Sequence, residues 1–298
     1  MLFTNTEHRN FAKDPAVVHY HGCYYLYHSV FFDDGGEDSL GISIATSTDL
    51  EHWTIAGDIP HTQPCECHGT GAPAAIVLDD VIHLFYQTYG NLQKDAICHA
   101  TSTDGLHFVK DETNPIWSPT NDWCCGRAID ADIVVFHGKL YMYFATRDHA
   151  YQVQKLGGCV ADLDSGFGRG AWTQLVNQSI LAPEMEWEQI CIEAPATIEN
   201  NGQLFLFYGG AYNCKPQQIG VAISDDGVLF RRIWNTPFMG PGPKDAFNAC
   251  ESGHPYAFRD DDGRAYLFYQ GSPDFGKTWY LSKVEIAFNE KNEPYLVK

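Results

Sequence analysis

The stretch from Asp14 to Tyr27, DPAVVHYHGCYYLY, decides the fold. Two runs rich in β-branched and aromatic residues flank the pair His21-Gly22, and residues of these types are enriched in strands. A short glycine-containing connection between two such runs is the signature of a β-hairpin. The stretch therefore predicts two antiparallel strands joined by a tight turn.

The same hairpin recurs five times along the chain. Each copy opens with a small residue or proline, followed by an apolar run, a turn and an aromatic-rich run. The first strands begin at residues 14, 72, 130, 194 and 254, so the intervals are 58, 58, 64 and 60 residues. Such regular spacing indicates a repeat architecture that fills the chain.

A second pattern follows at least three of these hairpins. It consists of a strand, an acidic turn and an aromatic residue, and it occupies residues 44–53, 98–108 and 221–230. Weaker versions lie at residues 162–172 and 278–288, with a short last strand near 294–297. We therefore expect an all-β fold, a five-bladed β-propeller with four antiparallel strands per blade, as one domain over residues 1–298. The alternative is an irregular pair of β-sandwiches, which the regular intervals disfavour.

Composition narrows the possible partners. The chain has 38 acidic and 19 basic residues, a formal net charge of -19. A surface of this charge repels phosphate backbones and anionic lipids, so we expect no nucleic-acid or membrane partner. Residues 1–14 lack an apolar run of the kind found in signal peptides, which predicts a cytoplasmic protein. Self-association stays open.

The start of each first strand carries the candidate chemistry. In a propeller the innermost strands all begin on one face, so their first residues form a ring around the axis. Here the ring consists of Asp14, Ala72, Asp130, Ala194 and His254, with Glu193 directly before Ala194. Carboxyl groups crowded into one pocket repel and desolvate one another, which pushes their pKa values apart. A purely structural ring has no need of them.

Two carboxyl groups in different protonation states are what glycosidic cleavage requires, because one protonates the leaving oxygen and the other activates water or attacks carbon. Aromatic side chains nearby suit a sugar site, and Phe31, Trp123 and Tyr212 lie in loops expected on the same face. His68, four residues before Ala72, is a further candidate for substrate binding. Arg127 and Arg147 complete the candidate binding set.

At this point the whole chain resembles glycoside hydrolase family 43. Five short motifs carry the resemblance, in order and in phase with the repeat: Asp14-Pro15, Ala72-Pro73, Ile129-Asp130-Ala131, Glu193-Ala194-Pro195 and Gly253-His254. The resemblance implies that Asp14 is the general base, that Glu193 is the general acid, and that Asp130 holds the acid and raises its pKa. It also implies inversion of configuration, with the carboxyl groups of Asp14 and Glu193 roughly 6.5–9.5 Å apart.

The resemblance implies no obligatory cofactor, although His254 is a candidate contact for an axial ion, commonly calcium. Ala131 departs from the pattern because proline is commoner there. No extra β-sandwich follows the propeller, and this favours arabinan-, arabinoside- or galactoside-acting members over xylosidases. The related fructosidase families usually show arginine directly before the blade-three aspartate and Glu-Cys in blade four. Here Ile129 precedes Asp130 and Ala194 follows Glu193, so the nearby Arg127 and Cys191 do not occupy the positions that the fructosidase pattern requires.

The leading expectation is an inverting, exo-acting glycoside hydrolase. Its substrates would be arabinofuranosyl, xylosyl or galactosyl ends of plant-type oligosaccharides, since those reaching a cytoplasm are short. One alternative is a glycoside phosphorylase, in which Arg127 and Arg147 would bind phosphate. A fructosidase-like enzyme and a sugar-binding propeller without activity are the others.

Overall fold

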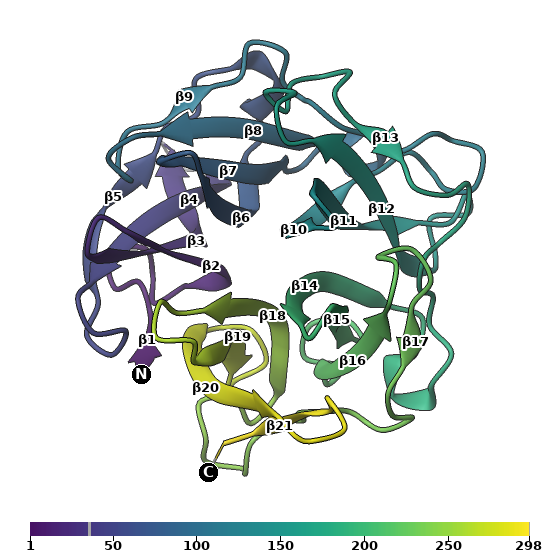
Figure 1. Cartoon of the computed structure of the whole chain (residues 1–298). Coiled ribbons are helices and arrows are strands. Elements are labelled where there is room, and N and C mark those ends of the chain that lie inside the picture. Colours follow the sequence, from purple (N-terminus) through teal and green to yellow (C-terminus); the bar gives the residue numbers. More distant parts are fainter. Residues whose placement is uncertain (35–36, 298) are drawn as a thin grey trace.

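The computed structural model describes residues 1–34 and 37–297, and it confirms the five-bladed β-propeller. Five antiparallel sheets are arranged around a central axis (Figure 1). Blade one contains β2 (Lys13–Tyr20), β3 (Cys23–Asp34), β4 (Glu37–Ser47) and β5 (Thr54–Ile59). Blade two contains β6 (Thr70–Leu78), β7 (Val81–Thr88), β8 (Ile97–Ser102) and β9 (Val109–Lys110).

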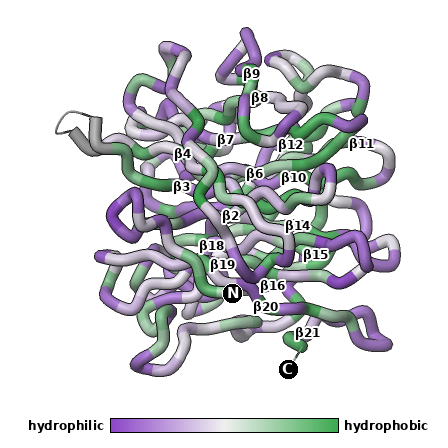
Figure 2. The backbone as a smooth tube through the Cα atoms, turned by 90° about the vertical axis from the view of Figure 1, so that its left-hand side faces the viewer, coloured by the Kyte–Doolittle hydropathy of each residue, from purple (hydrophilic) through white to green (hydrophobic). Residues whose placement is uncertain are grey.

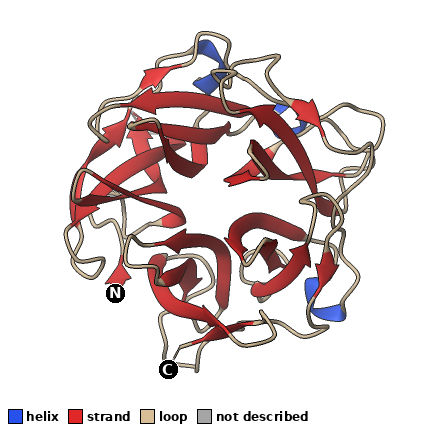
Figure 3. Cartoon of the chain, viewed as in Figure 1, coloured by secondary structure: helices blue, strands red, loops and turns tan. Residues whose placement is uncertain are grey.

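The next two blades repeat this order from the axis outward. Blade three contains β10 (Ile129–Phe136), β11 (Lys139–Arg147), β12 (Gln154–Asp162) and β13 (Thr173–Gln174). Blade four contains β14 (Ile192–Asn200), β15 (Gln203–Gly210), β16 (Gln218–Ser224) and β17 (Arg231–Arg232). The short helical segments among the described residues are the 3-10 turns η1 (Pro64–Glu66), η2 (Leu92–Lys94) and η3 (Glu186–Glu188), which lie at the rim (Figure 3). None of the described helices has the length and apolar character of a membrane span.

Blade five is closed by strands from both ends of the chain. It contains β18 (Glu251–Arg259), β19 (Ala265–Ser272) and β20 (Tyr280–Phe288), and β21 (Pro294–Leu296) pairs with β20 as expected. The strand β1 (Leu2–Phe3) also pairs with β20, with Leu2 opposite Ser282. The repeat did not reveal β1, because two residues are too few to show a period. This pairing joins the first blade to the last and closes the ring.

Each hydrophobic core lies between two neighbouring blades. Phe85 and Ile97 of blade two pack in one cluster with Ile133 and Met142 of blade three, and the pattern continues around the ring. The last cluster joins Phe268 of blade five to blade one. Figure 2 shows hydrophobic stretches along the strands and hydrophilic residues in many of the outer turns. Burial on both faces of each blade therefore holds the five first strands in one ring.

A β-bulge interrupts every first strand at the same place. In each blade the pairing with the second strand shifts register there. One residue at each bulge has φ between 41° and 53°, which is a strained value for a residue with a Cβ atom: Asp14, Ala72, Asp130, Ala194 and His254. Bulges re-aim side chains, and these five positions are the ring that the repeat predicted.

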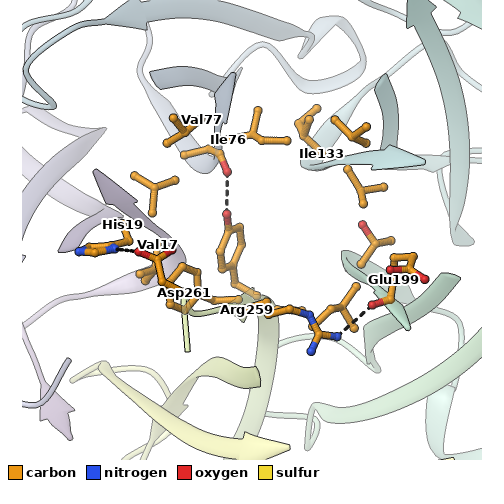
Figure 4. A pocket seen from close by; sticks show the side chains of 17 residues that line it. Val17, His19, Ile76, Val77, Ile133, Glu199, Arg259 and Asp261 are labelled. Atoms are coloured by element: carbon orange, nitrogen blue, oxygen red, sulfur yellow. Dashed lines mark hydrogen bonds and ion pairs between the residues drawn. The ribbon is translucent and has the colours of Figure 1, made fainter. Parts of the chain in front are cut away.

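The channel along this axis has a cavity at each end, and we call the one at the bulges the upper cavity and the one at the far end the lower cavity. The end away from the bulges holds one of about 350 Å³ lined mainly by apolar side chains, including Val17, Ile76 and Ile133 (Figure 4). The Tyr256 hydroxyl donates to the Ala75 carbonyl across this cavity over 2.8 Å. His19 faces Asp261 at the edge, with 2.8 Å between Nδ1 and Oδ2.

Candidate active site

The opposite cavity, of about 250 Å³, lies where the first strands begin. It brings together the carboxyl groups of Asp14, Asp130 and Glu193, which come from blades one, three and four. All three residues are less than 10% exposed. Residues that are 63 or more positions apart in sequence thus share one pocket, as the phase of the repeat predicted.

Asp14 is held as an anion by two cations. Its Oδ1 lies 3.0 Å from Nδ1 of His254 and 3.9 Å from Nζ of Lys13. Burial alone would raise the pKa of Asp14, but the charges of His254 and Lys13 more than offset this and hold it well below its usual range. Burial would likewise lower the pKa of His254, and the Asp14 charge raises it instead. A stably ionised carboxylate is suited to accept a proton.

Glu193 is gripped by two glutamine amides. Gln217 Nε2 donates to Glu193 Oε1 over 2.6 Å, and Gln154 Nε2 donates to Oε2. The Oε1 atom of Gln154 accepts from Nε of Arg147 at 2.9 Å, which fixes the orientation of that amide. Gln217 also accepts from the backbone N–H of His254, so one side chain links Glu193 to the bulge of blade five.

Gly253 leaves room for the Gln217 side chain that links Glu193 to the blade-five bulge. A Cβ atom built on Gly253 would lie 1.8 Å from Gln217 Oε1, far inside van der Waals contact. The Gly253-His254 step therefore has a packing reason, because the glycine admits Gln217 and the histidine faces Asp14.

Asp130 differs from both other carboxyl groups. Its backbone N–H donates to Gln87 Oε1 at 2.7 Å, but no hydrogen bond among the described residues ends on its carboxyl group. Burial raises the pKa of Asp130, and the nearby charges of Glu193 and Asp14 add to this increase against the opposing charge of His254. The cavity thus contains one carboxyl group that stays ionised and one that retains its proton to higher pH.

The candidate binding residues divide into two groups. Phe31, Arg127, Arg147 and Tyr212 line the cavity. His68 is exposed and lies outside the lining, beside Gly90. Trp123 also lies outside it, with its ring packed near Gly157 and 5.0 Å from Nζ of Lys155.

Several lining residues escaped the sequence analysis. Lys13 occupies in blade one the pre-bulge position that Glu193 occupies in blade four, so the repeat itself contained that signal. Tyr89 directly follows β7, the second strand of blade two, and lines the cavity. Gln154, a lining residue, is the first residue of β12, and Gln217, a partner of Glu193, directly precedes β16. An amide at either position carries no motif.

His254, the candidate contact for an axial calcium ion, faces Asp14. Calcium binds six to eight oxygen atoms, whereas His254 directs Nδ1 at Asp14 in an ion pair. Within the described ranges, the only group of three metal-ligating side chains within 4.8 Å is His19, Asp260 and Asp261, at the other end of the channel. The axial calcium ion stays a prediction, and no step below passes through a metal.

Comparison with known proteins now identifies the family. The family model for glycosyl hydrolases family 43 matches residues 3–289. The chain belongs to this family. It is a glycoside hydrolase whose match spans all five blades.

Three known proteins illustrate the relationship. A thermostable family-43 glycoside hydrolase superposes with a TM-score of 0.78 at 18% identity, covering 96% of this chain and 93% of its own. An exo-1,5-α-L-arabinanase from a bovine ruminal metagenomic library gives 0.71 at 18% identity, covering 97% of each chain. A β-1,2-mannobiose phosphorylase from Thermoanaerobacter sp. (strain X514) is 26% identical over 133 residues, which is 40% of this chain and 42% of that protein.

Proposed function

We propose that this family 43 enzyme is an inverting, exo-acting hydrolase that removes arabinofuranosyl, xylosyl or galactosyl ends from plant-type oligosaccharides. The observation that carries the proposal is the set of three buried carboxyl groups, in three different environments, around one cavity. Inverting glycosidases need one ionised and one protonated carboxyl group on opposite sides of the scissile bond.

In the proposed reaction a single displacement by water cleaves the glycosidic bond. The Asp14 carboxylate takes a proton from a water molecule, and the water oxygen attacks the anomeric carbon. The bond from that carbon to the leaving oxygen breaks, and Glu193 gives its proton to the leaving oxygen. Solvent then removes the proton from Asp14 and returns one to Glu193, so each turnover consumes one water molecule.

Each surrounding residue has a role in this scheme. His254 and Lys13 keep Asp14 ionised before attack, since both lie within 4 Å of its carboxylate. Gln154 and Gln217 orient the acid from both of its oxygens. Burial raises the pKa of Asp130, so its carboxyl group retains a proton to higher pH than a free aspartate, which limits the negative charge in the cavity.

Exo-action is supported by the small size of the cavity. Its 250 Å³ is below the usual range of about 300–1,000 Å³ for ligand pockets, so it suits one terminal sugar. The likeness to the exo-1,5-α-L-arabinanase shows a shared fold and not a shared substrate. Its name gives a reason to test arabinofuranosyl ends first.

The test is a panel of 4-nitrophenyl α-L-arabinofuranoside, β-D-xyloside and β-D-galactoside, together with arabino- and xylo-oligosaccharides. We expect release of single sugars from at least one, with no requirement for phosphate and with turnover by Glu193→Gln reduced by about 10²- to 10⁴-fold. Turnover that depends on inorganic phosphate would replace the hydrolase with a phosphorylase. Tight sugar binding without turnover across the panel would favour a binding protein.

A further inference from the structure

Two arginines of blade three converge on one side of the catalytic cavity. The guanidinium carbon of Arg147 lies 4.4 Å from the centre of the Tyr151 ring, and that of Arg127 lies 5.9 Å from the same ring. Arg147 also lies 5.5 Å from the Tyr212 ring. Both arginines line the cavity, so two like charges share a partly desolvated space. This arrangement is costly without an anion nearby.

The protein supplies an anion for only one of the two. Arg127 donates to Asp95 Oδ2 from Nε and Nη2, at 3.4 and 3.3 Å. Arg147 donates only to neutral acceptors, Gln154 Oε1 at 2.9 Å and the Tyr151 carbonyl at 3.5 Å. In the part of the chain that the structure describes, no carboxylate lies within ion-pair distance of Arg147. A guanidinium in this position is suited to bind a carboxylate with charge-assisted hydrogen bonds.

The place of this positive charge indicates which part of the ligand bears the negative one. The amide of Gln154 accepts a hydrogen bond from Arg147 and donates one to Glu193. Arg147 therefore lies beside the group that protonates the leaving oxygen. The nucleophile approaches from the side of Asp14, where the cations Lys13 and His254 already face the carboxylate of that residue. A phosphate nucleophile would have to bind on that side, away from the arginines.

We propose that Arg127 and Arg147 form a subsite for a carboxylate on the leaving-group side of the scissile bond, so that the enzyme prefers acidic oligosaccharides containing a uronosyl residue. This inference rests on the proposed hydrolase function for the orientation of the ligand. The protein's net charge of -19 opposes approach of such a ligand over long distances. Solvent ions screen this repulsion beyond about 8 Å, whereas contact with Arg147 lies inside that range.

The first experiment compares two leaving groups on the glycone that the substrate panel identifies, 4-nitrophenol and 3-carboxy-4-nitrophenol. The measured quantity is the ratio of kcat/KM for the carboxylated substrate to that for the neutral substrate. We expect Arg147→Gln to lower this ratio roughly 10- to 100-fold, because a hydrogen bond to a charged group is lost. Arg147→Lys keeps the charge and should retain part of the preference.

Arg264→Gln is the matched control. It removes the same charge from an exposed arginine that pairs with Asp262 in the turn between β18 and β19. The kcat/KM ratio of this variant should therefore equal that of the wild type. An equal ratio in the wild type and Arg147→Gln would overturn the proposal. So would phosphate-dependent cleavage of the neutral substrate that Arg147→Gln abolishes, because the arginines would then bind phosphate.

A binding measurement separates this subsite from the hydrolase assignment. Calorimetry on the wild-type chain compares galacturonate with galactose and glucuronate with glucose. At least one acid should bind roughly tenfold or more tightly than its neutral partner, whether or not the panel shows turnover. If each acidic sugar bound with the same affinity as its neutral partner, the carboxylate subsite would be overturned. If an acidic sugar bound selectively but the substrate panel showed no hydrolysis, only the proposed enzyme function would be overturned.

Discussion

Two buried carboxyl groups on one strand beside the central channel lie in opposite circumstances. Asp130 and Asp132 lie two residues apart on β10, and burial raises the pKa of both. Asp132 accepts hydrogen bonds from the backbone N–H of Thr197, at 2.8 Å, and from its hydroxyl. Asp130 lines the upper cavity, and none of the hydrogen bonds in the described part of the chain ends on its carboxyl group. A raised pKa therefore does not mark the site, whereas a carboxyl group left available in a cavity does.

The two ends of the channel also differ in how polar groups are used. The lower cavity is crossed by the Tyr256 hydroxyl, which is already bonded to Ala75. At the upper end, amides of Gln154 and Gln217 grip one carboxylate and leave the space before it open. Polar groups at the lower end join blades, and those at the upper end orient a reactive group.

The largest effect should come from the reactive pair at the upper end. Asp14→Asn and Glu193→Gln keep the shape of each side chain but remove proton transfer, which contributes about 10²- to 10⁴-fold to rate. We expect losses of that order in kcat/KM on the best substrate, with thermal midpoints close to the wild type. Activity within threefold of wild type in Glu193→Gln would remove Glu193 from the role of acid.

A smaller effect should follow from removing one of the amides that hold the acid. Gln217→Ala takes a donor from Glu193 and an acceptor from the His254 N–H, so we expect kcat to fall roughly tenfold or more with less change in KM. Gln203→Ala is the matched control, since its amide bonds Asp225 at the surface. Equal kinetics of the two variants would show that Gln217 does not position the acid.

The third prediction concerns pH and Asp132. Its pKa is raised to about 7 by burial, so the protonated form stabilises the fold below about pH 4 and this contribution is lost as pH rises through 7. Relative to Asp132→Asn, the free energy of unfolding of the wild type should fall by up to about 1.4 kcal/mol per pH unit in that window. Denaturant titrations at pH 4.5, 5.5 and 6.5 measure the difference. A difference independent of pH would show that Asp132 is ionised throughout.

The smallest expected effect lies at the lower cavity. Tyr256→Phe removes the hydroxyl that bonds Ala75 across the channel, and such a bond contributes about 1 kcal/mol. Thermal unfolding should show a loss of that size, while kcat/KM stays at the wild-type value. A large loss of activity would mean that the two ends of the channel are coupled.

The repeat predicted the architecture because the same hairpin returns in phase five times, and phase alone places Asp14, Asp130, Glu193 and His254 together. It could not predict the partners of these residues. Gln154 and Gln217 reach Glu193 from the beginnings of the third strands β12 and β16, where no short motif records an amide. His68 and Trp123 lay near the ring in sequence, yet loop geometry directs them away from the cavity. Strand starts were predictable because blade packing fixes them, whereas loop side chains were predicted only in part: Arg127 and Tyr212 line the cavity, and His68 and Trp123 do not.

The stereochemistry of the first product tests the central claim most directly. Proton NMR during hydrolysis of the best substrate records which anomer appears before mutarotation. Water activated by Asp14, on the face opposite Glu193, predicts that the first sugar released has the inverted anomeric configuration. Release of the retained anomer would mean that a carboxylate attacks the anomeric carbon itself, and it would contradict the roles assigned to Asp14 and Glu193.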